Sequence, residues 1–216
     1  MMSKVFSISE DHKPKDGLTI STAAKIQSQT DITYFSLGKD TDITPETYAR
    51  TTIYIGIDGE GKFKVGNRQK ETTLGRGEML IVPENTLCGV RTKEGFVYME
   101  VMPRKEIFMN SVVKAGEVFK LAESLPYEEG SIVSMDVATN DAMKFVLLAF
   151  DEGTKLSPHR APGDALVFAL EGKAVIGYEG TEHVIKAGES FHFEKDALHS
   201  VKADGKYKMA LLLTLS

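Results

Sequence analysis

The sequence predicts an all-β protein made of two tandem copies of one small barrel unit. Three observations carry this prediction: a repeat that spans nearly the whole chain, short β-rich runs separated by glycines, and a composition suited to two cores of ordinary size. The chain has 216 residues, of which 42% are hydrophobic. That is enough for one large core or for two domains of about 100 residues each.

The repeat appears as self-similarity at a nearly constant shift. Val5-Phe6-Ser7-Ile8 aligns with Val118-Phe119-Lys120-Leu121, a shift of 113 positions from 5 to 118. Gly77 falls on Gly188, a shift of 111 from 77 to 188. The small difference lies in a turn-rich stretch, where hairpin loops tolerate changes of length. The repeat therefore predicts two domains, at 1–113 and 114–216.

Each copy consists of short β-rich runs between closely spaced glycines, which is the pattern of an antiparallel sandwich or barrel. The predicted strands are 51–57, 62–65, 79–82 and 96–101 in the first copy and 166–170, 173–177, 190–193 and 206–213 in the second. Residues 21–29 have some helical character, but their counterpart in the second copy is poor for a helix. We therefore expect an irregular or strand-edge segment there.

Composition excludes several classes of function. The 26 basic and 31 acidic residues give a net charge of −5, which argues against non-specific electrostatic binding to nucleic acid or to an anionic membrane. The longest apolar runs are far below the roughly 20 residues that cross a bilayer. A single cysteine, Cys88, allows no internal disulfide, and the N-terminus lacks the pattern of a secretory signal. We expect a cytoplasmic protein, as a monomer or a homodimer.

Two segments of the second copy resemble the two sequence motifs of the cupin superfamily. The segment from Gly153 to Gly172 contains His159 and resembles the first motif, and the segment from Gly188 to His199 resembles the second. Glu194 and Asp196 replace the usual proline and inner glycine of the second motif. Together with the repeat, the chain resembles a bicupin. The resemblance implies two tandem double-stranded β-helix (jelly-roll) barrels.

The resemblance also implies a divalent metal at the mouth of a barrel, held by three histidines and a glutamate. In the second copy His159 and His199 take the first and last of these positions, while Ala161 stands at the second and an alanine or leucine at the glutamate position. Asp164 would be a third ligand only if a slip or bulge turned it inward. Such a set suits Fe, Mn, Ni, Co or Zn when water or substrate completes the shell.

Three interpretations of the histidine pair stay open at this point: a metal site, a hydrogen-bonded pair that shapes a ligand pocket, and a purely structural pair. We expect Leu166, Phe168 and Phe193 to line the interior beside His159 and His199, which suits a small, partly hydrophobic ligand. The prediction is a cupin-type small-molecule-binding protein. The alternatives are a metal-dependent enzyme of the dioxygenase, isomerase or lyase kind, and a structural pseudo-enzyme. The sequence identifies no catalytic residue.

The first copy is predicted to be a degenerate barrel without a metal site. The four ligand positions there hold no histidine; they are Glu46, Tyr48, Ile53 (or Thr52) and Cys88. A thiol with one carboxylate and a phenol is a poor divalent site. The alternating isoleucines at 53, 55 and 57 indicate plain core, and Cys88 is expected to be a buried, inert thiol.

Two further side chains of the second copy are predicted to be structural. His192 lies between Phe191 and Phe193, so if those rings line the interior, His192 faces outward. Arg160 follows His159 and should point away from it. An arginine there is expected at the surface more often than as an anion ligand.

Overall fold

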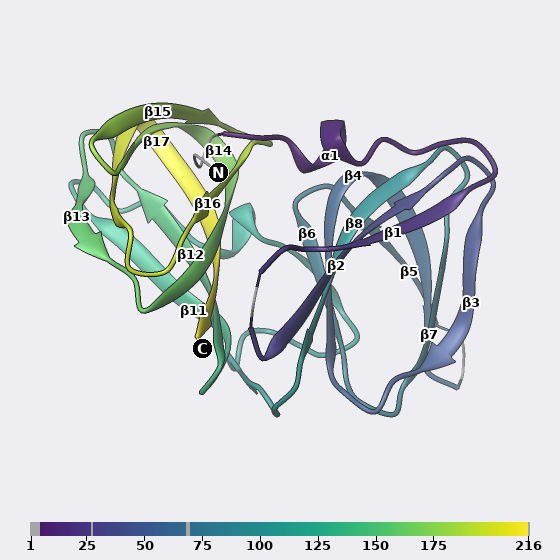
Figure 1. Ribbon diagram of the computed structural model, residues 1–216. Coiled ribbons are helices and arrows are strands. Elements are labelled where there is room, and N and C mark those ends of the chain that lie inside the picture. Colours follow the sequence, from purple (N-terminus) through teal and green to yellow (C-terminus); the bar gives the residue numbers. More distant parts are fainter. Residues whose placement is uncertain (1–4, 27, 68–69, 216) are drawn as a thin grey trace. The chain divides into compact units, whose positions relative to one another are not determined.

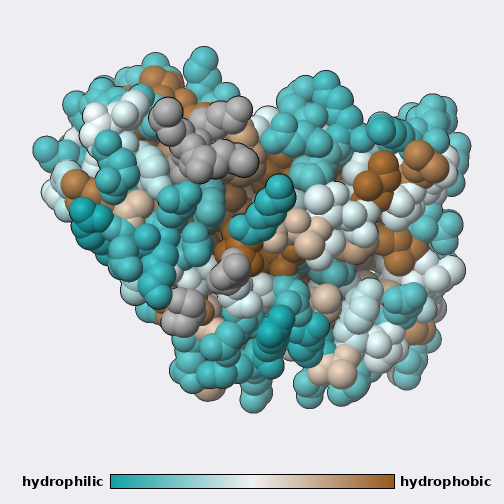
Figure 2. Space-filling view, in the orientation of Figure 1, coloured by the Kyte–Doolittle hydropathy of each residue, from teal (hydrophilic) through white to brown (hydrophobic). Residues whose placement is uncertain are grey.

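A computed structural model describes residues 5–26, 28–67 and 70–215 of the chain (Figure 1). The chain divides into two compact units, each built from separate segments. Ser9–Ile107 and Ser111–Lys120 form the N-terminal unit. Leu121–Ser216 and Phe108–Asn110, with the described residues of Met1–Ile8, form the C-terminal unit. Hydrophilic residues cover most of the face that Figure 2 shows.

The N-terminal unit contains a nine-stranded sheet among its described residues. Six strands follow one another in the order β1-β2-β8-β4-β6-β10, β5 and β7 pair with β4, and β3 pairs with β7. The strands are β1 (Thr19–Ala23), β2 (Thr30–Leu37), β3 (Asp42–Thr47), β4 (Thr52–Val65), β5 (Lys70–Gly75), β6 (Glu78–Val82), β7 (Leu87–Arg91), β8 (Phe96–Pro103) and β10 (Val118–Lys120).

The C-terminal unit contains an eight-stranded sheet among its described residues. The main order is β15-β14-β17-β12-β11-β9, and β13 pairs with β17 and β16 with β14. The strands are β9 (Phe108–Met109), β11 (Ile132–Asn140), β12 (Met143–Phe150), β13 (Lys155–Arg160), β14 (Gly163–Tyr178), β15 (Thr181–Lys186), β16 (Ser190–Phe193) and β17 (Leu198–Leu215).

Helical structure in the described part of the chain is limited to α1 (Ile8–Asp11) and the short 3-10 turn Ala122–Ser124. The all-β prediction is therefore confirmed. The segment 21–29 forms no helix: β1 covers its first residues, and residue 27 lies outside the described residues. Of the helices described here, none has the length and apolar character needed to cross a membrane.

Two long strands each join two runs that were predicted as separate strands. β4 covers 51–57 and 62–65 almost entirely, and β14 covers 166–170 and 173–177. The first part of β4 pairs with β6 and β8, and its last part pairs with β5 and β7. Register shifts interrupt both strands near the middle. A bulged strand bends, which lets one continuous strand serve two parts of a sheet.

The bend of each long strand contains a glycine, and any other residue at that position would destabilise the fold. Gly59 has φ 70° and Gly172 has φ 72°, and the two are equivalent under the shift of 113. A Cβ at Gly59 would overlap the carbonyl oxygen of Gly95, and a Cβ at Gly172 would overlap that of Lys206. Both the left-handed conformation and the close backbone approach therefore require glycine.

The start of each sequence repeat pairs with a strand of the other repeat. Phe6 bridges to Ser190 in the C-terminal unit, with backbone hydrogen bonds in both directions. In the N-terminal unit Phe119 of β10 pairs with Met79 of β6. Under the repeat alignment Phe6 corresponds to Phe119 and Met79 to Ser190. The two pairings therefore occupy matching positions, and each unit is completed by a segment from the opposite repeat.

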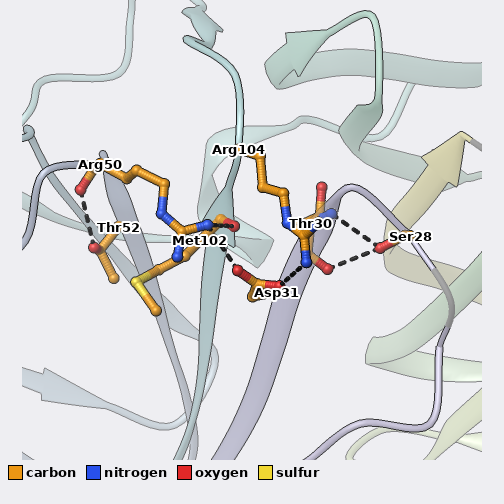
Figure 3. A network of polar contacts seen from close by, with 7 residues as sticks. All are labelled: Ser28, Thr30, Asp31, Arg50, Thr52, Met102 and Arg104. Atoms are coloured by element: carbon orange, nitrogen blue, oxygen red, sulfur yellow. Dashed lines mark hydrogen bonds and ion pairs between the residues drawn. The ribbon is translucent and has the colours of Figure 1, made fainter.

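A network of charges ties three chain segments together at one end of the N-terminal unit (Figure 3). The Asp31 carboxylate accepts hydrogen bonds from Arg50 at 2.7 Å and from Arg104 at 3.0 Å. These two hydrogen bonds hold the pKa of Asp31 below its usual range. Asp31 lies in β2, Arg50 precedes β4 and Arg104 follows β8, so the network links the ends of these three strands.

We expect Gly172→Ala to lower the free energy of unfolding by about 3 kcal/mol, because left-handed φ costs a residue with a Cβ roughly 1–2 kcal/mol and the backbone overlap adds to it. Gly180→Ala is the matched control, since Gly180 also has positive φ but has open space at its Cβ position. It should cost only about 1 kcal/mol. Urea unfolding of both variants measures the difference. Equal losses would contradict a role for the close approach at Gly172.

Candidate functional site

The candidate site is a pair of histidines on neighbouring strands. β13 pairs with β17 so that His159 lies directly opposite His199. The two ring centroids are 4.3 Å apart, with an angle of 55° between the rings. His199 is buried, with 5% of its surface exposed, whereas His159 is exposed. The two side chains therefore lie next to each other, as the sequence predicted.

The backbone holds both rings in one tautomer. His159 Nδ1 lies 2.8 Å from the carbonyl oxygen of Ser157, and His199 Nδ1 lies 2.9 Å from that of Ala197. A carbonyl oxygen can only accept a hydrogen bond, so each Nδ1 carries the proton and donates it. The Nε2 atom of each neutral ring therefore keeps its lone pair. In the described part of the chain, no residue hydrogen-bonds to either Nε2.

Phe193 supports His199 from the core. The two rings stack with centroids 4.0 Å apart and only 20° between their planes. Phe193 is almost completely buried, and Tyr178 stacks on it with centroids 6.0 Å apart. Phe193 was predicted to line the pocket. Its burial assigns it a different task, which is to hold the His199 ring in place.

Burial lowers the pKa of His199, and the neighbouring His159 lowers it further, while the hydrogen bond to Ala197 acts in the opposite direction. The charged form of a buried imidazole loses hydration, and a second imidazole nearby repels it once that ring is protonated. At neutral pH His199 is therefore uncharged. A neutral ring with a free Nε2 can accept a hydrogen bond or bind a metal.

Two of the predicted lining residues face the wrong way. The interior cluster of the C-terminal unit includes Ala165, Val167 and Ala169 of β14. Since side chains alternate along a strand, Leu166 and Phe168 lie on the opposite face of β14, away from the histidine pair. The prediction was off by one residue, and a slip of one residue exchanges the two faces of a strand.

Asp164 lies on that opposite face as well and does not join the histidine pair. Its Oδ1 atom is 3.0 Å from Nε2 of His192, so the two form a hydrogen bond or, with His192 protonated, an ion pair. The bulges of β14 come after Asp164, at 169–174, and cannot turn it inward. The expectation that His192 faces outward is confirmed. Within the described residues, no cluster of three or more His, Cys, Asp or Glu could hold a metal.

Arg160 makes structural contacts at the surface, as predicted. Its Nη1 atom donates a hydrogen bond to the carbonyl oxygen of Asp196 and lies 3.7 Å from Oε1 of Glu179. The Glu179 carboxylate in turn accepts a hydrogen bond from the backbone nitrogen of Leu198. Arg160 thereby links β13 to the loop before β17 and to the turn between β14 and β15.

The N-terminal unit places Glu46 opposite Cys88 through the pairing of β3 with β7, in the register that His159 and His199 have in the other unit. Cys88 is buried, which raises the pKa of its thiol to about 11. The expected burial of Cys88 is confirmed, and the raised pKa disfavours the reactive thiolate. Tyr48 donates a long hydrogen bond of 3.4 Å to Glu46 at the edge of this region.

The sequence prediction missed a buried acid in the N-terminal unit. Glu100 is only 5% exposed and lies in β8, directly opposite Tyr54 of β4 and Thr33 of β2. Burial raises the pKa of Glu100 to about 7, with a further increase from Glu46 and an opposing effect of Arg50. One signal was available: Glu100 is the only charged residue in the run Phe-Val-Tyr-Met-Glu-Val-Met.

Comparisons with known proteins agree with the all-β fold. Residues 146–215 match the cupin domain family. A cupin 2 conserved barrel domain protein from Leptotrichia buccalis has 25% sequence identity and a TM-score of 0.87, with 99% of this chain and 98% of that chain covered. A salicylate 1,2-dioxygenase from Pseudaminobacter salicylatoxidans has 10% identity and a TM-score of 0.71, with 99% and 84% covered. No curated protein matches the sequence.

We expect the His199 resonance to titrate below the ordinary histidine pKa of 6.5, because burial disfavours its charged form. A histidine with a lowered folded-state pKa contributes stability that is present above pH 6.5 and is lost as the pH falls through the folded-state pKa. Ring-proton NMR over a pH series checks the value, and His199→Gln identifies the resonance by its disappearance. A midpoint at or above 6.5 would refute the burial argument.

The contribution of Glu100 to the free energy of unfolding should change with pH in the opposite direction. Its pKa is about 7 in the folded chain and 4.5 ordinarily, so the folded state binds the proton more tightly. The resulting stability is present below pH 4.5 and is lost as the pH rises to about 7, a change of about 3 kcal/mol. Glu100→Gln should lack this part of the slope in urea unfolding across pH 4–8. Parallel profiles for the two proteins would contradict the prediction.

Proposed function

Because the comparisons support the cupin superfamily for this chain, we propose that it is a cupin-type small-molecule-binding protein. The ligand site lies at the His159–His199 pair of the C-terminal unit. One observation carries the proposal: two imidazoles meet at 4.3 Å, and the backbone fixes both with Nε2 free. The described chain therefore leaves both Nε2 atoms available to a ligand or to water.

The chemistry of the pair suggests the class of ligand. Two neutral Nε2 atoms accept hydrogen bonds and offer no donor, so they suit a ligand that presents hydroxyl or acid protons. An acidic ligand could also transfer its proton to the exposed His159 and remain beside the cation as an anion. Small acids, sugars and phenols meet this requirement. His199, held by Phe193 and the Ala197 carbonyl, would contribute a fixed acceptor.

We further propose that the two units are tandem cupin barrels, so that the chain is a bicupin whose sequence repeats, near 1–113 and 114–216, exchange their first segments. The internal repeat supports this, as do the matching positions of the Phe6–Ser190 and Phe119–Met79 pairings. The ligand site would then belong to the second barrel alone, since Glu46 and Cys88 replace the histidines in the first.

A metal-dependent enzyme is the second candidate, and one observation favours it. Histidines that bind metals commonly donate their other ring nitrogen to a backbone carbonyl, as both of these do. Against it, Ala161 stands where a second histidine would, and Asp164 bonds to His192 instead. The described residues thus supply two ligands of the expected four and do not fit a resident metal without further donors. The likeness to the dioxygenase concerns the fold alone.

A single preparation separates these candidates. The chain is purified without a histidine tag, its metal content is measured, and it is screened by thermal shift against small acids, sugars and phenols. A ligand that binds only the folded state must raise its melting temperature. We expect at least one compound to do so by several degrees, and His159→Ala, His199→Ala to abolish the shift. Arg160→Ala, which changes a neighbouring surface residue, tests for non-specific effects.

The outcomes are distinct. Stoichiometric metal that disappears in the double variant would replace the binding proposal with the metal-dependent enzyme. A thermal shift that persists in the double variant would move the ligand away from these histidines. No shift with any compound and no metal would leave a structural pseudo-enzyme, and would overturn the proposal.

A further inference from the structure

The N-terminal unit contains a cavity of about 40 Å³, in the region equivalent to the histidine pair of the other unit. A space of this size holds about three water-sized groups. Side chains from β2, β3, β4, β7 and β8 surround it; the lining residues are Phe35, Ile43, Tyr48, Tyr54, Phe63, Cys88, Gly89, Val90, Tyr98 and Glu100. Tyr48 is half-buried and bonds to the exposed Glu46, so the cavity approaches the surface on that side.

Glu100 is the one carboxylate that lines this cavity. Side chains alternate along β8, so Glu100 shares the inward face with Phe96 and Tyr98, which both belong to the interior cluster. Among the hydrogen bonds and ion pairs of the described residues, none involves the Glu100 carboxylate. A largely buried carboxylate without a partner in the chain is costly, so its position favours a donor or a cation from outside the chain, either water or a ligand.

The charges around Glu100 are unbalanced. The lining contains no lysine, arginine or histidine; apart from Glu100, its titratable groups are the three phenols and the Cys88 thiol. Glu46 adds negative charge from the edge, and Arg50, the cation that acts on Glu100, is bound to Asp31 at 2.7 Å. An anionic ligand would be repelled here. In the described part of the chain, no third acid, thiol or imidazole completes a divalent metal site.

Aromatic rings enclose the same space. Phe35 stacks on Tyr98 with centroids 4.9 Å apart, and Tyr54 lies 5.0 Å from Phe63 and 5.9 Å from Tyr98. Aromatic faces attract cations, most strongly where water is excluded. A carboxylate within a set of phenol and phenyl rings has the chemistry that recognises an organic ammonium group.

This polar set belongs to the N-terminal unit alone. Under the repeat shifts, Tyr54 corresponds to Val167, and Glu100 corresponds to Leu211. The register agrees, since Tyr54 pairs with Glu100 and Val167 pairs with Leu211. Where one unit has plain apolar core, the other has a buried acid and a phenol. The fold itself therefore does not require them.

We propose that the cavity of the N-terminal unit binds the ammonium group of a small primary amine, with the Glu100 carboxylate as counter-ion and the surrounding tyrosines and phenylalanines as its cage. The volume admits the nitrogen and one or two carbons. A longer ligand would extend towards the half-buried Tyr48 and the exposed Glu46. The site is separate from the histidine pair and does not depend on the function assigned to that pair.

Ethylammonium chloride is the probe, titrated into the full chain by isothermal calorimetry at pH 8, with ethanol, sodium acetate and magnesium chloride as comparison solutes. We expect ethylammonium to bind and the other three not to. Glu100→Gln should weaken binding by at least about tenfold, since a charge-assisted contact is lost. Glu94→Gln, which changes an exposed acid of the same unit, and the His159→Ala, His199→Ala double variant should bind as the unmodified chain does.

A pH series on the unmodified chain gives a second test that needs no variant. The amine stays protonated between pH 6 and 8, whereas protonation of Glu100 removes the counter-ion, so binding should weaken as the pH falls. The proposal is overturned if ethylammonium does not bind at pH 8, if ethanol, acetate or magnesium binds as well, or if Glu100→Gln leaves the affinity unchanged. A pH-independent affinity also overturns it.

Discussion

The long antiparallel ladder between β14 and β17 determines which side chains of the C-terminal unit face its interior and where His199 lies. It runs from Gly163 opposite Leu215 to Tyr178 opposite His199, and the same end of β17 pairs with β13. Because side chains alternate with a period of two, this one register decides which residues face the interior and where His199 points. Gly172 makes such a long strand feasible, since only a glycine accepts the bend next to the Lys206 carbonyl.

The two units place different chemistry at equivalent positions. One presents two imidazoles, one exposed and one buried. The other encloses a carboxyl group whose pKa burial raises to about 7, among phenols and a protonated thiol. Their responses to pH have opposite signs: falling pH charges His199 and neutralises Glu100. The chain therefore carries two local environments of different polarity within one repeated framework.

The sequence predicted the all-β class, the strand positions and the contact between His159 and His199, because glycine spacing, repeats and motif positions are local signals. It did not predict which face of β14 is interior. Ala165 and Leu166 are both apolar and both buried, so no polar alternation marks the inward side. In β4, Ile53 and Ile55 are buried as predicted, but so is Tyr54 between them, and Tyr54 is the one that belongs to the interior cluster. Glu100 stands outside the positions of the expected metal set, so the resemblance to cupins does not point to it.

The exchange of Phe6 and Phe119 between repeats means that the natural boundary in the sequence is not a boundary in the fold. A fragment that ends at residue 113 would keep Phe6, which pairs with Ser190 of the C-terminal unit. It would lack β10, which pairs with β6 and completes the N-terminal unit. Two copies of a single repeat could exchange these segments with each other, which is the arrangement of a swapped dimer. Gene fusion would then turn an intermolecular exchange into an intramolecular one, and association would no longer depend on protein concentration.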